Sequence, residues 1–127
     1  MRKRSIVGAT FIALSLSTSS PWAAPAGVAH SSFDGRWSVL IVTDAGTCDR
    51  AYRYALDISD GRVTYNDPSF QISGHVDARG RVSVSVAAGG ERANGTGELS
   101  GDSGRGLWQG NSSTSACSGH WEAERRG

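Results

Sequence analysis

The sequence predicts an all-β domain, a small antiparallel up-and-down barrel of about eight strands with one disulfide. Apolar and polar side chains alternate in a series of short segments, as in strands that bury one face. Turn-forming dipeptides rich in glycine separate these segments, and no stretch shows a helical period. Short strands at such close spacing are typical of a small barrel or sandwich.

The N-terminal region has the three parts of a secretory signal peptide. Met1-Arg2-Lys3-Arg4 is positively charged, residues 6–16 are apolar, and Ala24-Pro25-Ala26 fits a cleavage site before Gly27. Cleavage after Ala24 is a second option, and a buried N-terminal helix is the alternative for the whole segment. We therefore expect a signal peptide over 1–26, a flexible lead-in over 27–32 and the barrel over 33–126. Such a leader predicts a periplasmic or secreted bacterial protein.

Charge and hydropathy argue against nucleic-acid binding and against a transmembrane helix. Loss of Arg2, Lys3 and Arg4 with the signal peptide changes the formal charge from +1 to −2. A near-neutral chain has no basic surface for bulk capture of nucleic acid. No apolar run reaches the roughly 18 residues of a transmembrane helix, so we expect no transmembrane segment in the mature chain.

The first four strands follow from alternation and turn residues. Residues 37–43 are rich in β-branched side chains, and residues 51–59 alternate sharply. Asp60-Gly61 predicts a tight hairpin turn into a short strand over 62–65. After a loop over 66–69, the alternation resumes at residues 70–77.

The last four strands show the same pattern, some of them more weakly. Three turn segments, at 79–80, 89–90 and 100–102, separate successive strands. A serine-rich loop precedes the last strand. The four predicted strands span residues 82–86, 91–99, 103–110 and 117–123.

Cys48 and Cys117 are predicted to form a disulfide. An exported chain meets an oxidising compartment, and these are its two cysteines. Two free or metal-bound thiols are the alternative. Counting by twos from each cysteine reaches apolar residues, so we expect both on the apolar faces of their strands. In a closed eight-strand meander the first strand lies between the second and the last, and the bridge would cross this closure, which removes exposed edges.

Tryptophans with a nearby glycine recur along the chain, as Gly35-Arg36-Trp37, Gly106-Leu107-Trp108 and Gly119-His120-Trp121. Large rings bury much apolar area, and a neighbouring glycine lets backbone pass close to them. The Gly-x-Trp opening of the first strand resembles that of calycin barrels such as the lipocalins.

A longer pattern resembles a family of small exported proteins from alphaproteobacteria. It comprises Phe33-Asp34-Gly35-Arg36-Trp37, Thr43, Cys48, Tyr52-x-Tyr54, Gly104-x-Gly106-x-Trp108 and Cys117 to Arg125. Some of its members carry a label of haem utilisation or adhesion. The resemblance brings no catalytic motif to this chain. The plan is also similar to that of bacterial inhibitors of secreted metalloproteases, which insert an N-terminal segment into the enzyme; residues 27–32 would have that role here.

Catalytic and metal-binding patterns are missing from the sequence. His75 and His120 fall on outward positions and His30 lies in the lead-in, so we expect surface histidines. Asp34, Asp60 and Asp102 sit beside turn residues. We therefore predict no enzyme activity, no metal and no cofactor; haem is disfavoured because side chains fill most of a small barrel.

Seven aromatic residues are expected to face the interior, opposite a wall of glycines. They either pack into a filled core or line a small apolar cavity suited to a hydrophobic ligand. The sequence thus favours a non-catalytic binding protein for an unknown small hydrophobic ligand or a protein partner. A protease inhibitor and an envelope adhesion protein are the alternatives. The seven residues are Trp37, Tyr52, Tyr54, Tyr65, Phe70, Trp108 and Trp121.

Overall fold

The computed structural model describes residues 32–127 together with Gly8, Ala13 and Ser15. The rest of the predicted signal peptide and residues 27–31 of the lead-in lie outside the described residues.

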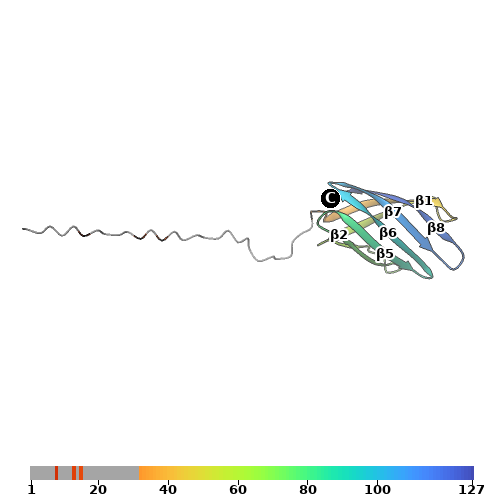
Figure 1. Ribbon diagram of the computed structural model, residues 1–127. Helices are drawn as coiled ribbons and strands as arrows, with labels where there is room; N and C mark the ends of the chain where they lie inside the picture. Colours follow the sequence, from red (N-terminus) through yellow and green to blue (C-terminus); the bar gives the residue numbers. More distant parts are fainter. Residues whose placement is uncertain (1–7, 9–12, 14, 16–31) are drawn as a thin grey trace, which may run out of the picture.

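Eight antiparallel strands in chain order close into a barrel, which confirms the predicted fold (Figure 1). Strand β1 is hydrogen-bonded to both β2 and β8, so the first and last strands complete the wall. The strands are β1 (Gly35–Ala45), β2 (Ala51–Ser59), β3 (Arg62–Thr64), β4 (Gln71–Val76), β5 (Arg81–Ala88), β6 (Glu91–Ser100), β7 (Ser103–Asn111) and β8 (Ala116–Arg125).

The sequence alternation decides which side chains face inward. In β4 and β5, Ile72 lies opposite Val86 and Val76 opposite Val82, while Ser83 is exposed between them. Side chains of a strand point alternately to its two faces. The observed register therefore turns the valines of both strands inward and the serines outward.

The predicted Asp60-Gly61 hairpin forms between β2 and β3. Both residues have positive φ, 52° and 75°, as a type I′ turn requires. The Asp34 carboxylate accepts the backbone N–H groups of Asp60 at 2.9 Å and Gly61 at 3.2 Å. The segment before β1 is therefore fastened to the β2–β3 turn at this end of the barrel.

This end of the barrel is filled, and Trp37 is the centre of its packing. Trp37 is only 1% exposed, and its indole N–H donates to the Phe33 carbonyl at 2.8 Å. The Arg125 guanidinium lies 4.9 Å from the indole centroid and also donates to the Asp102 carboxylate at 2.8 Å. The buried apolar residues here are Phe33, Trp37, Val39, Ile58, Val63, Val76, Leu99 and Ala123.

Two other tryptophans lie flat against glycines of the neighbouring strand. The Trp121 ring, from β8, covers Gly106 of β7 and donates its N–H to the Thr96 carbonyl of β6 at 3.2 Å. The Trp108 ring, from β7, covers Gly119 of β8 and donates to the Val42 carbonyl of β1 at 2.9 Å. Each indole thus spans three strands, and a Cβ on the covered glycine would overlap it. Of the glycines expected to form a wall, Gly106 is covered by Trp121, whereas Gly119 was not among them.

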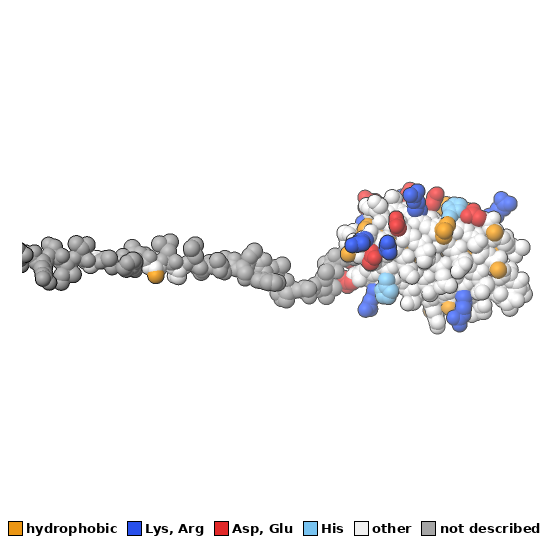
Figure 2. Space-filling view, in the orientation of Figure 1, with side chains coloured by type: hydrophobic (Ala, Val, Ile, Leu, Met, Phe, Trp, Pro, Cys, Tyr) orange, Lys and Arg blue, Asp and Glu red, His pale blue; other side chains and the backbone are white. Residues whose placement is uncertain are grey.

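The outer surface is polar over most of the face seen in Figure 2, where acidic and basic side chains intermingle. Leu107 is the one large aliphatic residue in the described part of the chain that is exposed, with 67% of its surface accessible. Among the described residues, none belongs to a helix of the length and hydropathy needed to cross a membrane.

Candidate functional site: the open end of the barrel

The end of the barrel opposite Trp37 is open. Four connections surround this mouth: residues 46–50, 65–70, 89–90 and 112–115. The cavity that they surround has a volume of about 760 Å³ and narrows toward Trp121 and Trp37. Sites for small molecules range over roughly 300–1,000 Å³, so the barrel is a cup of suitable size.

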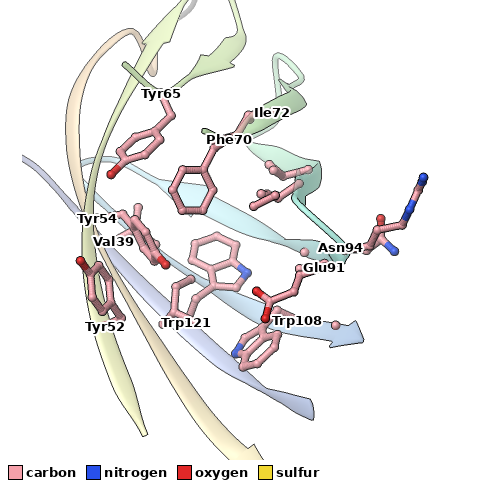
Figure 3. A pocket seen from close by; sticks show the side chains of 18 of the residues that line it. Val39, Tyr52, Tyr54, Tyr65, Phe70, Ile72, Glu91, Asn94, Trp108 and Trp121 are labelled. Carbon is pink, nitrogen blue, oxygen red and sulfur yellow. The ribbon is translucent and has the colours of Figure 1, made fainter. Parts of the chain in front are cut away.

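The wall of the cup combines aliphatic and aromatic side chains, with Val39 beside Tyr54 and Ile72 beside Phe70 (Figure 3). Each aliphatic side chain is the inward member of a strand's alternation. Leu56, Val82 and Val84 line the lower part, whereas Ile41 pairs with the rim residue Tyr52 and Ile72 pairs with Val86 nearer the mouth.

All seven aromatic residues predicted to face the interior line this one cavity. Trp37 lies at the closed end and Trp121 is also buried. Tyr52 lies at the rim and is 54% exposed. The structure brings the seven together, but it distributes them from floor to rim.

Four rings form a cluster on the side of β2 and the β3–β4 loop (Figure 3). Tyr54 lies 4.6 Å from Tyr52 between ring centroids and 5.8 Å from Tyr65, which it meets edge to face. Phe70 completes the cluster 5.4 Å from Tyr65, also edge to face. The four rings thus form one continuous aromatic surface along this side of the cavity.

The cavity also has charged residues that the sequence interpretation missed. Glu91 projects into the cup from the start of β6, on the side of Trp108 (Figure 3). Asp49, Asp67 and Arg92 border the mouth. The signal for Glu91 was present in the sequence, because it is in phase with the inward Ala93 and Gly95 of the same strand.

The environment of Tyr54 raises the pKa of its phenol above the usual 10.0. Burial is the main cause, since it disfavours the charged phenolate. The neighbouring tyrosines and the carboxylates of Asp49 and Glu91 add to the effect. The phenol is therefore neutral at physiological pH and acts as a hydrogen-bonding group.

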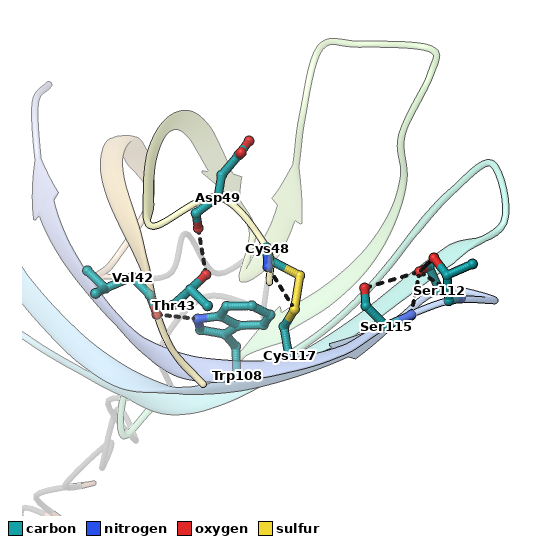
Figure 4. The surroundings of a disulfide bond; sticks show 9 residues. Val42, Thr43, Cys48, Asp49, Trp108, Ser112, Ser115 and Cys117 are labelled. Atoms are coloured by element: carbon teal, nitrogen blue, oxygen red, sulfur yellow. Dashed lines mark hydrogen bonds between the residues drawn. A yellow bond between two sulfur atoms is a disulfide. The ribbon is translucent and has the colours of Figure 1, made fainter. Parts of the chain in front are cut away.

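The disulfide lies at the mouth of the cup (Figure 4). Cys48 and Cys117 are bonded, with their Cα atoms 6.2 Å apart. The expected position of Cys48 was wrong: it lies exposed in the loop between β1 and β2, whereas Cys117 is buried on β8. Counting by twos from Cys48 fails because the loop interrupts the strand geometry.

The β1–β2 loop is held by more than the disulfide (Figure 4). The Thr43 hydroxyl donates to the Asp49 carbonyl at 2.6 Å, and the Thr43 backbone N–H donates to the Arg50 carbonyl at 2.8 Å. This loop is thereby fastened at both of its ends, and with it one side of the rim.

Of the two alternatives for the interior, a filled core and a small apolar cavity, the open half of the barrel has the cavity. The glycines of β6 and β7 take up no interior space, and two indoles lie flat against the wall instead of crossing the centre. A largely filled interior was the argument against room for haem, and that argument no longer holds.

His75, His120, Asp34, Asp60 and Asp102 do not line the cup, and His30 lies outside the described residues. His75 is exposed, and the His120 ring Nδ1 lies 2.7 Å from the Asp44 carboxylate on the outer face. Asp34 and Asp102 hold the closed end together, as described above. Within residues 32–127, no three His, Cys, Asp or Glu side chains form a group able to hold a metal ion.

Comparison with protein-family models, curated proteins and solved structures finds no match for this chain.

Proposed function

We propose that this protein is an exported, non-catalytic binding protein whose cup holds a small hydrophobic ligand. The observation that carries the proposal is the cavity of about 760 Å³, open at one end and plugged at the other by Trp37 and its neighbours. A mostly apolar pocket with a few polar groups is the usual form of a small-molecule site.

The cavity favours this function over the two alternatives. An adhesion protein would need an outer apolar surface rather than an interior one. An inhibitor would use the lead-in, whose residues 27–31 lie outside the described residues, while Ser32 is held by Arg125 through its carbonyl at 2.8 Å.

Titration with N-phenyl-1-naphthylamine, a neutral apolar dye, tests whether the cup binds ligands. We expect saturable dye fluorescence and quenching of the tryptophans that line the cavity. Val86→Trp places a large ring in the upper cup, because Val86 faces inward on β5. It should weaken dye binding by about tenfold or more.

Ser83→Trp is the matched control, because Ser83 is exposed on the outer face of the same strand. It should leave dye binding unchanged. Absence of saturable binding, or equal affinity of the two variants, would contradict the proposal. If the dye binds as expected, mass spectrometry of protein purified natively from its source would identify the natural ligand.

A further inference from the structure

Building on the proposed binding function, we propose that the ligand of the cup is an amphiphilic organic cation. Its apolar part would lie in the aliphatic lower cup, and its ammonium group would lie near the mouth, between the tyrosines and Glu91. Two features of the mouth support this class of ligand: its negative charge, to which the free carboxylate of Glu91 contributes, and its aromatic surface.

The charge of the cavity lining is negative. Its ionisable acids are Asp49, Asp67 and Glu91, against the single base Arg92, among the described residues. Arg92 is opposite in phase to Glu91 on β6, and both side chains are exposed at the mouth. Arg50 is exposed in the β1–β2 loop and does not line the cavity. A cation therefore meets a complementary potential on entering, and an anion meets a repulsive one.

The aromatic surface favours a cation as well. The face of a phenol, benzene or indole ring attracts positive charge within about 6 Å of its centroid. Tyr54, Tyr65 and Phe70 meet edge to face, with centroids 5.4–6.3 Å apart. All three rings line the cavity, so a ligand that enters it meets an aromatic surface of the kind that attracts an alkylated ammonium group.

The carboxylate of Glu91 has no ion-pair or hydrogen-bond partner in the part of the chain that the structure describes. Asp67 differs in this respect, because one of its carboxylate oxygens accepts the Ser69 backbone N–H at 2.9 Å. Burial is the main cause of the raised pKa of Tyr54, and Glu91 adds to it after the neighbouring tyrosines and Asp49. The Glu91 carboxylate is thus available to neutralise a bound ammonium group.

Isothermal titration with three probes of equal chain length tests the charge preference: decyltrimethylammonium, decanol and decanoate, each below its micellar concentration. We expect the affinity to fall in that order, with the cation bound about tenfold or more tightly than the anion. This comparison uses the unaltered protein and so does not depend on any variant.

Glu91→Gln tests the carboxylate directly. It should weaken binding of decyltrimethylammonium by about fivefold and leave binding of decanol unchanged. Glu98→Gln removes the same charge from the outward face of the same strand and should change neither.

The outcomes separate the two proposals. Equal or weaker binding of the cation relative to decanol would overturn the cation preference and leave the proposed binding function standing. An equal effect of Glu91→Gln and Glu98→Gln would overturn the role of Glu91. Failure of decanol and the neutral dye to bind at all would overturn the binding function itself, and the cation proposal with it.

Discussion

At the scale of single residues, Trp37 shows how one side chain closes a barrel. Its ring fills the closed end, its N–H group is satisfied by the Phe33 carbonyl, and Arg125 covers its face. Arg125 also donates to the Ser32 and Asp34 carbonyls at 2.8 and 2.5 Å. The closed end therefore combines apolar burial with a network of hydrogen bonds to backbone.

Trp37→Ala should lower the free energy of unfolding by about 3–5 kcal/mol, because it removes a fully buried aromatic side chain and leaves a cavity. A urea titration followed by circular dichroism measures the change. Trp37→Phe retains much of the apolar area and should cost less. A loss below about 1 kcal/mol for the alanine variant would contradict the assigned burial.

Gly106→Ala should destabilise the barrel by about 1–3 kcal/mol through overpacking. The added Cβ would lie 2.5 Å from atoms of the Trp121 ring and would also meet the Thr96 carbonyl oxygen. Thermal unfolding compares it with Gly90→Ala, where a Cβ meets nothing within 4 Å. Equal stability of the two variants would show that Trp121 does not lie against Gly106.

At the scale of elements, the β4–β5 turn illustrates a stabilising carboxylate. One Asp77 carboxylate oxygen accepts the backbone N–H groups of Arg81 and Arg79, each at 2.9 Å. The bond from Arg81 is the main cause that lowers the pKa of Asp77 below 3.8, with the bond from Arg79 and the charges of both arginines adding to it. Ionised Asp77 therefore stabilises the folded turn.

Asp77→Asn should reduce stability at neutral pH and weaken the acid dependence of unfolding. Because the folded pKa is below the unfolded value of 3.8, the contribution is complete above 3.8 and is lost as the pH falls through the folded pKa. Urea titrations near pH 7 and at about pH 2.5 measure it. The difference between variant and native protein should shrink at the lower pH, and an unchanged difference would contradict this linkage.

At the scale of the whole molecule, the disulfide joins the β1–β2 loop to the last strand, across a sequence separation of 69 residues. Loop-closure entropy assigns such a bridge about 4 kcal/mol. Replacing both cysteines by alanine should therefore lower the free energy of unfolding by about 2–4 kcal/mol. Denaturant titration measures this, and reduced native protein should show the same loss. Alkylation of unreduced protein at either cysteine would contradict the bridge.

Export remains a prediction from residues 1–26. Intact-mass measurement of protein recovered from the periplasm or medium should give a chain that begins at or near Gly27. Exported protein that retains Met1 to Ala26 would contradict the predicted cleavage.

The sequence by itself determined the strands, their order and the pairing of the cysteines. Alternation with a period of two specifies which residues share a face, and Asp60-Gly61 specifies a hairpin through its positive φ values. These are local properties, and the observed strands differ from the predicted bounds by only a few residues at their ends.

Only the tertiary structure decided where the interior is filled and where it is hollow. The sequence pointed to all seven aromatic residues of the interior. The alternation of side chains along a strand carries no information on how a ring lies once it is inside. Trp108 and Trp121 lie flat along the wall because glycines of the adjacent strand admit them and because carbonyls two strands away accept their N–H groups. Trp37 instead fills the closed end. The cup follows from these non-local contacts, which closure of the barrel creates.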